Sequence, residues 1–199
     1  MVAAFLGLNP TPSDLVPLSS GGTSIVFRLS EASVLKVNWT SMLLSPNARA
    51  AFTTQKQSDY RAMSKQLGNL TLPQTAFTAT HPLFSNQEAM QIVQPHKQIT
   101  DPQLFAGDSV EDMAQTIENL ASHQSDIGAQ LSDFLERSRL LYTTSGLVPD
   151  TLGDANLVID DAGSLLMIDG LPLASDQPQY QQQALEQLNT LESTLLLAA

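Results

Sequence analysis

Two polar side chains, Asn156 and Asp169, stand at the outer ends of two short apolar runs in the last third of the chain. The runs, 157–159 and 165–168, flank a turn sequence of Asp, Ala and Gly, which predicts a hairpin. Because a hairpin brings its two ends together, we expect the two side chains to be neighbours. One amide oxygen and one carboxylate, completed by phosphate oxygens and water, suit octahedral Mg²⁺. The alternative is ordinary turn chemistry, since Asn and Asp are common at strand ends.

A second candidate is Lys36, which interrupts the apolar run Val34–Val37. A lysine in such a run is costly to bury unless an anion or a carboxylate lies beside it. The preceding turn, residues 19–24, is built from small residues and includes Gly21 and Gly22, so its backbone N–H groups can approach an anion closely. The alternative is a lysine on the wet side of an edge strand, with its stem covering apolar surface.

The loop that leads to Asn156 is rich in carboxylates and contains Asp150 and Asp154. Either acid could accept the proton of an attacking hydroxyl group during a transfer reaction. The alternative is an acidic loop that water simply solvates.

Hydrophobic periodicity and turn residues predict an α+β chain in two lobes. The first lobe, residues 1–94, would contain strands and one helix, and its apolar start would be a strand or a packed terminal arm. The second lobe, residues 95–199, would contain helices that enclose one hairpin. Strands are expected at 25–29, 34–37, 72–80 and 89–93, with a turn at 86–88, and helices from Ser45 or Asn47 to Leu67, from Ser109, at 127–142 and at 180–197.

In their order, these segments resemble the protein-kinase-like superfamily. The stretch from Leu18 to Val26 resembles the kinase glycine-rich loop, with Gly21 at the second loop glycine and Val26 at the valine that follows the loop. The run around Lys36 resembles the strand whose lysine holds the α- and β-phosphates. The resemblance covers about residues 15 to 173 and implies a minimal two-lobed kinase-like fold that binds ATP with Mg²⁺. The cofactor-binding residues that it implies are Gly21, Gly22, Val26, Lys36 and Asp59, with Val93 and Pro95 at the hinge beside the adenine.

The interval from Asn156 to Asp169 is thirteen residues, as between the catalytic-loop Asn and the metal-binding Asp of kinases. The resemblance therefore implies that both side chains hold the metal. The kinase catalytic Asp stands five residues before that Asn, a position that Thr151 occupies here, and we assign the role of base to Asp150 beside it. The acid that pairs with the lysine would be Asp59, with Gln55 as the alternative one helical turn earlier.

Only thirty residues follow Asp169, too few for a full activation segment and the helices that hold peptide substrates. The chain therefore resembles small bacterial kinase-like proteins more than eukaryotic regulators. The acceptor could be a protein or a small molecule.

Composition narrows the range of partners. The formal net charge is -11, which argues against nucleic-acid and anionic-membrane partners. The chain has no cysteine, which excludes disulfides and Cys-based zinc sites. Because no apolar run approaches the roughly 18 residues of a membrane span, we expect a cytoplasmic protein, or one exported without a recognisable signal peptide.

Three hypotheses follow for function. The first is a phosphotransferase that uses ATP and Mg²⁺ to phosphorylate a protein or small-molecule hydroxyl group. The second is a pseudokinase, a nucleotide-binding or partner-binding module without catalysis, which Thr151 at the catalytic position favours. The third is a small acidic chaperone whose Gln-rich last helix and Leu195–Leu197 tail pack on a partner.

Overall fold

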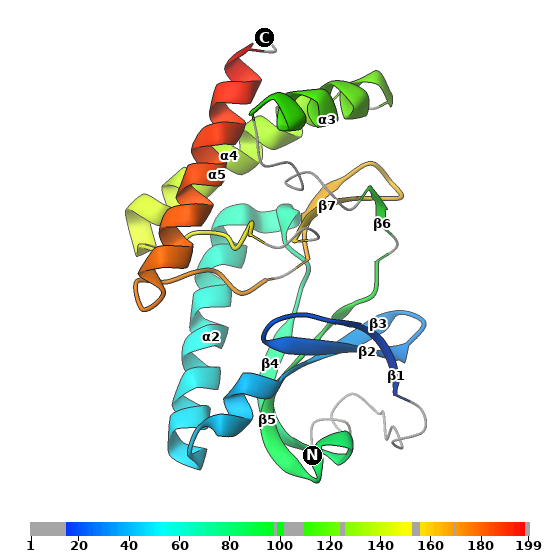
Figure 1. Ribbon diagram of the computed structural model, residues 1–199, viewed down its shortest axis with the longest axis vertical. Coiled ribbons are helices and arrows are strands. Elements are labelled where there is room, and N and C mark those ends of the chain that lie inside the picture. The colour runs from blue at the N-terminus through cyan, green and yellow to red at the C-terminus, as the bar shows by residue number, and fades with distance from the viewer. Residues whose placement is uncertain are drawn as a thin grey trace. The chain divides into compact units, whose positions relative to one another are not determined.

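The computed structural model describes residues 15–97, 99–101, 110–123, 126–152, 156–168 and 170–197 (Figure 1). These residues form an α+β protein, as predicted. The chain divides into two compact units, one of residues 1–58 and 73–97 and the other of residues 59–72 and 98–199. Asp154 and Asp169 lie outside the described residues, as does the apolar start of the chain.

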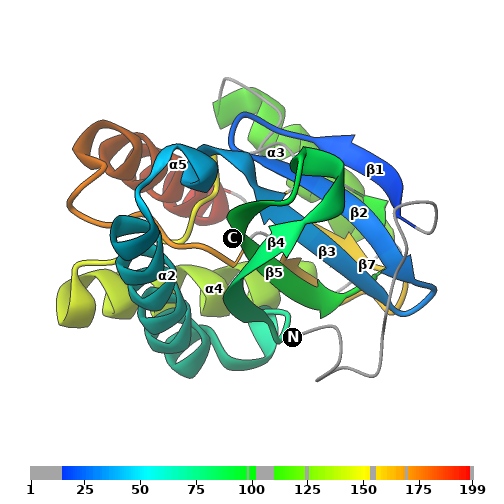
Figure 2. The ribbon, with the colours of Figure 1, turned by 90° about the horizontal axis from the view of Figure 1, so that it is seen from below.

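The first unit is built on a five-stranded antiparallel sheet of β1 (Val16–Ser20), β2 (Ser24–Ser30), β3 (Ser33–Asn38), β4 (Thr75–His81) and β5 (Gln87–Pro95). The strand order is β1-β2-β3-β5-β4, so β3 is the central strand (Figure 2). The predicted hairpin of residues 25–29 and 34–37 is confirmed as β2 and β3. β5 is longer than expected at both ends. It begins earlier because Ser85 and Asn86 make the left-handed turn, so that Gln87 already pairs with His81.

One face of this sheet carries the apolar core of the first unit. Alternate residues of β2 and β3, among them Phe27, Leu35 and Val37, point to that face and pack with Leu15 and Ala89. Such alternation follows from the two-residue period of a strand. Val26 of β2 and Lys36 of β3, which alternate with these residues, therefore lie on the opposite face. Ile92 of β5 is opposite Lys36 and shares this face, which we call the lysine face.

The helix predicted from Ser45 or Asn47 to Leu67 is confirmed as α2 (Pro46–Leu67). Ser45 begins it, since its hydroxyl oxygen accepts from the N–H of Ala48 and its carbonyl from the N–H of Arg49. The division between the two units falls inside this helix, after Ser58. Up to that point its buried residues are polar or charged, whereas Tyr60, Met63 and Leu67 belong to the core of the second unit. For that reason residues 59–72 group with the second unit rather than with residues 1–94.

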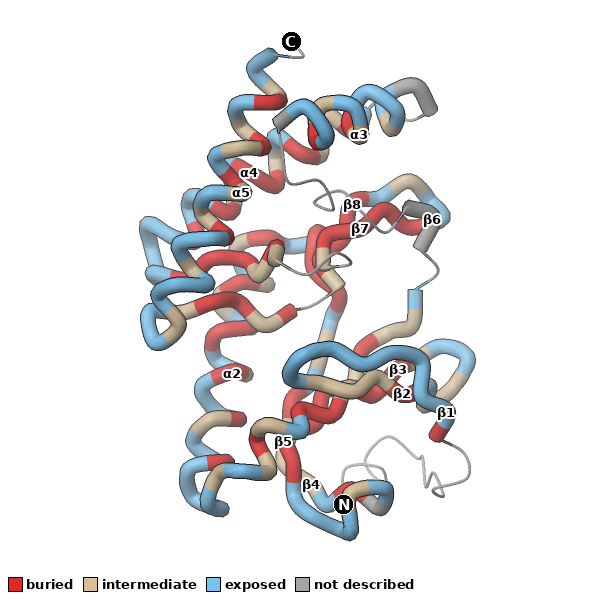
Figure 3. Tube along the Cα trace, viewed as in Figure 1, coloured by how far each residue is buried: buried red, intermediate tan, exposed pale blue. Residues whose placement is uncertain are grey.

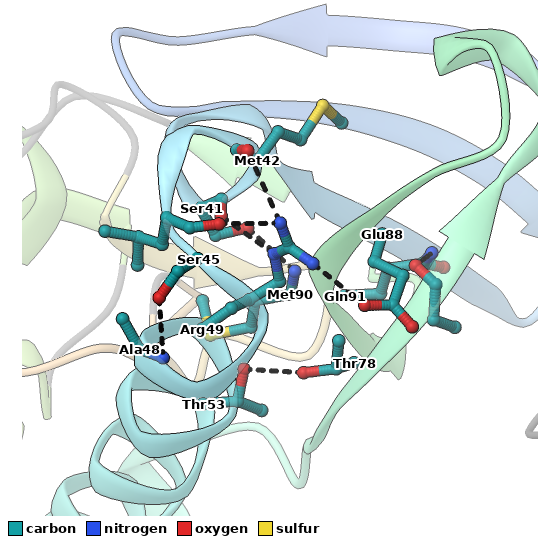
Figure 4. A network of polar contacts seen from close by, with 12 residues as sticks. Ser41, Met42, Ser45, Ala48, Arg49, Thr53, Thr78, Glu88, Met90 and Gln91 are labelled. Atoms are coloured by element: carbon teal, nitrogen blue, oxygen red, sulfur yellow. Dashed lines mark hydrogen bonds and ion pairs between the residues drawn. The ribbon is translucent and has the colours of Figure 1, made fainter.

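The start of α2 is tied to the sheet of the first unit by Arg49 (Figure 4). Its Nη1 lies 2.9 Å from a carboxylate oxygen of Glu88 on β5. Its Nε donates to the carbonyl oxygen of Ser41 at 3.0 Å and its Nη2 to that of Leu44 at 2.8 Å. Ser41 belongs to the 3₁₀ helix η2 (Trp39–Leu43), which connects β3 to α2.

Among the described residues, the second unit combines the end of α2 and three further α-helices with a small sheet of order β6-β7-β8. Helix α5 packs on both α3 and α4 (Figure 1). Strands β7 and β8, which form the predicted second hairpin, are buried throughout (Figure 3). No described helix is both long and apolar enough to cross a membrane. The elements are η3 (Gly68–Leu70), β6 (Ile99–Asp101), α3 (Val110–His123), α4 (Ile127–Ser145), β7 (Leu157–Asp160), β8 (Leu165–Met167) and α5 (Pro178–Leu197).

Candidate functional site

The turn between β1 and β2 is closed by one backbone hydrogen bond and is otherwise open. The N–H of Gly21 donates to the carbonyl oxygen of Ser24 at 2.8 Å, and the carbonyl of Thr23 accepts from Trp39 at 3.1 Å. A Cβ atom added to Gly21 or Gly22 would meet nothing within 4 Å. The fold itself does not require glycine here, so the small size of these residues is available for the close approach of a ligand.

Lys36 lies on the central strand of the sheet and is half-buried. The edge-strand alternative therefore does not hold. In the register of the sheet Lys36 is opposite Val26 on one side and Ile92 on the other, and Ile92 is opposite Ala76. The lysine face thus presents an ammonium group within an apolar row, one strand away from the small-residue turn.

The two predicted hinge residues lie near the end of β5. Val93 is opposite Leu35, and its side chain packs against the apolar core on the face that does not carry Lys36. Its side chain therefore does not line the lysine face. Pro95 is opposite Ser33 and ends the strand, and the N–H of His96 then donates to the carbonyl of Ala32 at 2.9 Å.

Between these residues stands Gln94, which belongs to the predicted hinge but whose side chain the sequence does not single out. Its side chain points to the lysine face and is 5% exposed. Its Oε1 is buried and accepts no hydrogen bond from the part of the chain that the structure describes. The two-residue period of the strand, counted from Ile92, places Gln94 on this face. That period does not reveal that the side chain is buried.

In the second unit, Asp150 and Asn156 are joined directly. The Nδ2 of Asn156 donates to the backbone carbonyl oxygen of Asp150 at 3.0 Å. The Oδ1 of Asp150 accepts from the N–H of Leu152 at 3.1 Å, which fixes the carboxylate relative to the loop. With its amide nitrogen used in this way, Asn156 keeps its amide oxygen as a candidate metal ligand.

Thr151 has a different surrounding from Asp150. Its side chain is 0% exposed, and its hydroxyl group donates to Gln187 of α5 at 2.7 Å. It therefore anchors the loop to the last helix. Asp150 is half-buried, so of the two neighbours it is the one whose side chain solvent can reach.

The second hairpin brings its ends together, as predicted. The N–H of Ile168, the residue before Asp169, donates to the carbonyl oxygen of Asn156 at 2.9 Å. The turn is held by Asp160, whose Oδ1 accepts from the N–H groups of Ala162 and Ser164 at 3.0 and 2.8 Å. Gly163 in this turn has a φ of 79°, the left-handed region that glycine adopts without strain.

Of the two residues predicted to pair with Lys36, Asp59 is buried within α2 and Gln55 is exposed. Burial favours Asp59 as the residue with a structural or binding role, since an ionisable group is rarely buried without one. Asp59 is the first residue of the second unit.

The metal-ligand set predicted from the sequence consists of Asn156 and Asp169, of which the structure describes Asn156. Among the described residues, no three His, Cys, Asp or Glu side chains gather as a metal site. An amide oxygen held in place by the Asp150 carbonyl fits a hard cation such as Mg²⁺, which takes few protein ligands and fills its sphere with phosphate and water.

No model of a known protein family matches the chain, and no curated protein matches its sequence.

Proposed function

We propose that this protein is a kinase-like phosphotransferase of minimal size, which binds ATP with Mg²⁺ and transfers the γ-phosphate to a hydroxyl group of a protein or small molecule. The observation that carries the proposal is the bond from the Asn156 amide to the Asp150 carbonyl. It couples the candidate metal ligand to the candidate base, although Thr151 occupies the usual position of the base. In such a site each side chain would have a distinct role.

Lys36 would hold the α- and β-phosphates, and its place on the third strand agrees with that of the kinase lysine. Asn156 and Asp169 would hold Mg²⁺, which supplies positive charge to the triphosphate and the transition state. Asp150 would orient the acceptor hydroxyl group and take its proton. Because phosphoryl transfer depends mainly on positioning and charge stabilisation, this reduced set suffices chemically.

The acidic composition makes the metal more important for binding. The chain has 9 basic and 20 acidic residues, so few protein cations are available to offset a triphosphate. We therefore expect nucleotide affinity to depend strongly on Mg²⁺.

The test is a thermal melt of wild type, Lys36→Met and Asn156→Leu with ADP or ATP, with and without Mg²⁺. Ligand at about 100 times its Kd stabilises the native state by about 2.7 kcal/mol, which raises Tm by roughly 5–10 °C for a chain of this size. We expect this rise in wild type with Mg²⁺ and its loss in both variants. Lys65→Met, an exposed lysine of α2, is the matched control and should keep the rise. A wild-type Tm that no nucleotide moves contradicts the proposal.

The second candidate function is a pseudokinase, which the buried Thr151 hydroxyl favours because it leaves no acid at the usual position. Transfer of labelled γ-phosphate, to the protein itself or to added acceptors, separates the two candidates. For an enzyme, Asp150→Asn should lower the rate by about 10²- to 10⁴-fold with nucleotide binding kept. Binding without any transfer in wild type identifies the pseudokinase.

A further inference from the structure

Gln94 and Gln91 are two buried glutamines of β5 with opposite surroundings. Gln91 points to the apolar core face, where its Nε2 donates to the carbonyl oxygens of Ala79 and Thr80 at 3.0 and 3.3 Å. Gln94 points to the lysine face, and its buried Oε1 accepts from no described residue. The first amide has a structural role, whereas the second has none within the described chain.

The surroundings of Gln94 make this amide costly for the fold alone. It is opposite Val34 on the central strand, and Val34 and the neighbouring Ile92 are 5% and 3% exposed. A buried polar group without a partner destabilises a protein, and an apolar side chain of the same length would avoid that cost. A glutamine at this position therefore points to a partner outside the described residues.

The Oε1 atom of Gln94 can accept from such a partner without losing an existing hydrogen bond to a described residue. It lies on the same face as Lys36, which is two residues further along β3 from its opposite residue Val34. A ligand whose phosphates reach Lys36 would thus carry its remaining part along this face.

We propose that Gln94 recognises the base of the nucleotide and selects adenine over guanine. This inference rests on the proposed function. The Oε1 atom would accept a hydrogen bond from the 6-amino group of adenine, and Nε2 would donate to ring nitrogen N7. Adenine presents this donor and acceptor side by side, which a glutamine amide matches. Guanine presents two acceptors, O6 and N7. In either orientation of the amide, the Oε1 atom therefore faces an acceptor.

The experiment measures the Kd of ADP, GDP and 7-deaza-ADP with Mg²⁺ by titration calorimetry, in wild type and in Gln94→Met. In wild type we expect ADP to bind about 5- to 150-fold more tightly than GDP, and 7-deaza-ADP, which lacks the N7 acceptor, to bind more weakly than ADP. In Gln94→Met the three affinities should converge. Methionine has nearly the same length as glutamine, and the unliganded variant should melt at the wild-type Tm or above it.

Gln91→Met is the matched control. It removes a bonded amide from the other face of the same strand, so it should lower Tm and leave the order of the three affinities unchanged. Equal affinities for ADP and 7-deaza-ADP in wild type would overturn the inference without any variant. Unchanged discrimination in Gln94→Met, or a fall in its Tm as large as that of Gln91→Met, would overturn it as well.

The outcomes also separate this inference from the function on which it rests. If wild type binds no nucleotide, both are wrong. If wild type binds ADP and GDP equally well, the nucleotide site stands and the role of Gln94 falls.

Discussion

Among single residues, His81 has the surroundings most sensitive to pH. It ends β4, is 1% exposed, and lies between the rings of Phe27 and Phe84 with ring centroids 5.2 and 5.1 Å away. Neither ring nitrogen has a hydrogen-bond partner in the described chain. Desolvation by burial lowers the pKa of His81 below its ordinary value of 6.5. The native protein therefore holds this imidazole neutral.

This burial predicts a loss of stability in mild acid. Below pH 6.5 the unfolded chain takes up a proton that the native state resists, so the free energy of unfolding falls as the pH falls towards the lowered native pKa. Well above pH 6.5 the imidazole is neutral in both the native and the unfolded state, and this loss of stability is absent. Denaturant unfolding of wild type and His81→Phe at pH 7.5, 6.5, 5.5 and 5.0 measures it. As the pH falls from 7.5 to 5.0, the free energy of unfolding should decrease more for wild type than for His81→Phe.

Carboxylates also titrate near the lower end of this range, but they are common to both proteins and cancel in the difference. His96→Gln serves as the control, because His96 is only half-buried and its Nδ1 lies 3.2 Å from the carbonyl oxygen of Glu31. Parallel curves for wild type and His81→Phe would show that His81 is not the group responsible.

At the scale of elements, the start of α2 depends on one arginine. Arg49 stands in the first turns of the helix, where the helix dipole disfavours a cation, and no acid occupies the first turn. Its guanidinium group is compensated instead by Glu88 and by carbonyl oxygens of the segment before the helix. A planar group with five N–H donors can contact all of them together, whereas a lysine ammonium cannot.

We therefore expect Arg49→Lys to lower the free energy of unfolding by about 2–4 kcal/mol. The loss arises because the variant removes the guanidinium donors from the carbonyl oxygens of Ser41 and Leu44. Arg61→Lys on the same helix is the control, since Arg61 is exposed, and it should change stability by less than about 0.5 kcal/mol. Urea unfolding measures both. A charge-only role for Arg49 predicts instead that the lysine variant is as stable as wild type.

Sequence patterns predicted most elements, because strands and helices carry local signals. Alternating β-rich residues with a polar turn identify β2 and β3. The helix predicted at 127–142 is α4, which extends to Ser145 before Gly146 adopts a φ of 69°. Strand order was less accessible. That β3 pairs with β5 and becomes central depends on contacts between residues far apart in sequence, and the edge-strand alternative for Lys36 stayed open until that order was known.

The candidate site was predictable to the extent that residue type reveals chemistry. A lysine in an apolar run and an Asn before a hairpin are visible in one sequence, and the structure places Ile168 beside Asn156 as the hairpin implied. The link between Asn156 and the Asp150 carbonyl depends on the path of a loop, and the missing partner of Gln94 depends on tertiary burial. Neither property has a local sequence signal, so the sequence does not single out the Gln94 side chain within the predicted hinge.

At the scale of the whole molecule, the imbalance of charge is the dominant electrostatic fact. The formal net charge is -11, and the ion pairs of the described residues include Arg49–Glu88, Arg137–Asp133 and Arg139–Glu192. The two exposed pairs, Arg137–Asp133 and Arg139–Glu192, contribute about 0–1 kcal/mol each. Repulsion among the remaining carboxylates therefore opposes the compact state more than ion pairs support it.

This imbalance predicts that salt stabilises the protein. Raising NaCl from about 0.02 to 0.5 M shortens the Debye length from roughly 20 Å to roughly 4 Å and screens the repulsion. We expect a gain on the order of 1 kcal/mol, or about 2–4 °C in Tm. The control variant combines Glu118→Gln on α3 and Glu136→Gln on α4, two exposed acids beyond the first turn of their helices that have no ion pair with a described residue. It should melt higher than wild type in low salt and respond less to added NaCl. A fall in wild-type Tm with salt would mean that ion pairs outweigh repulsion in this protein.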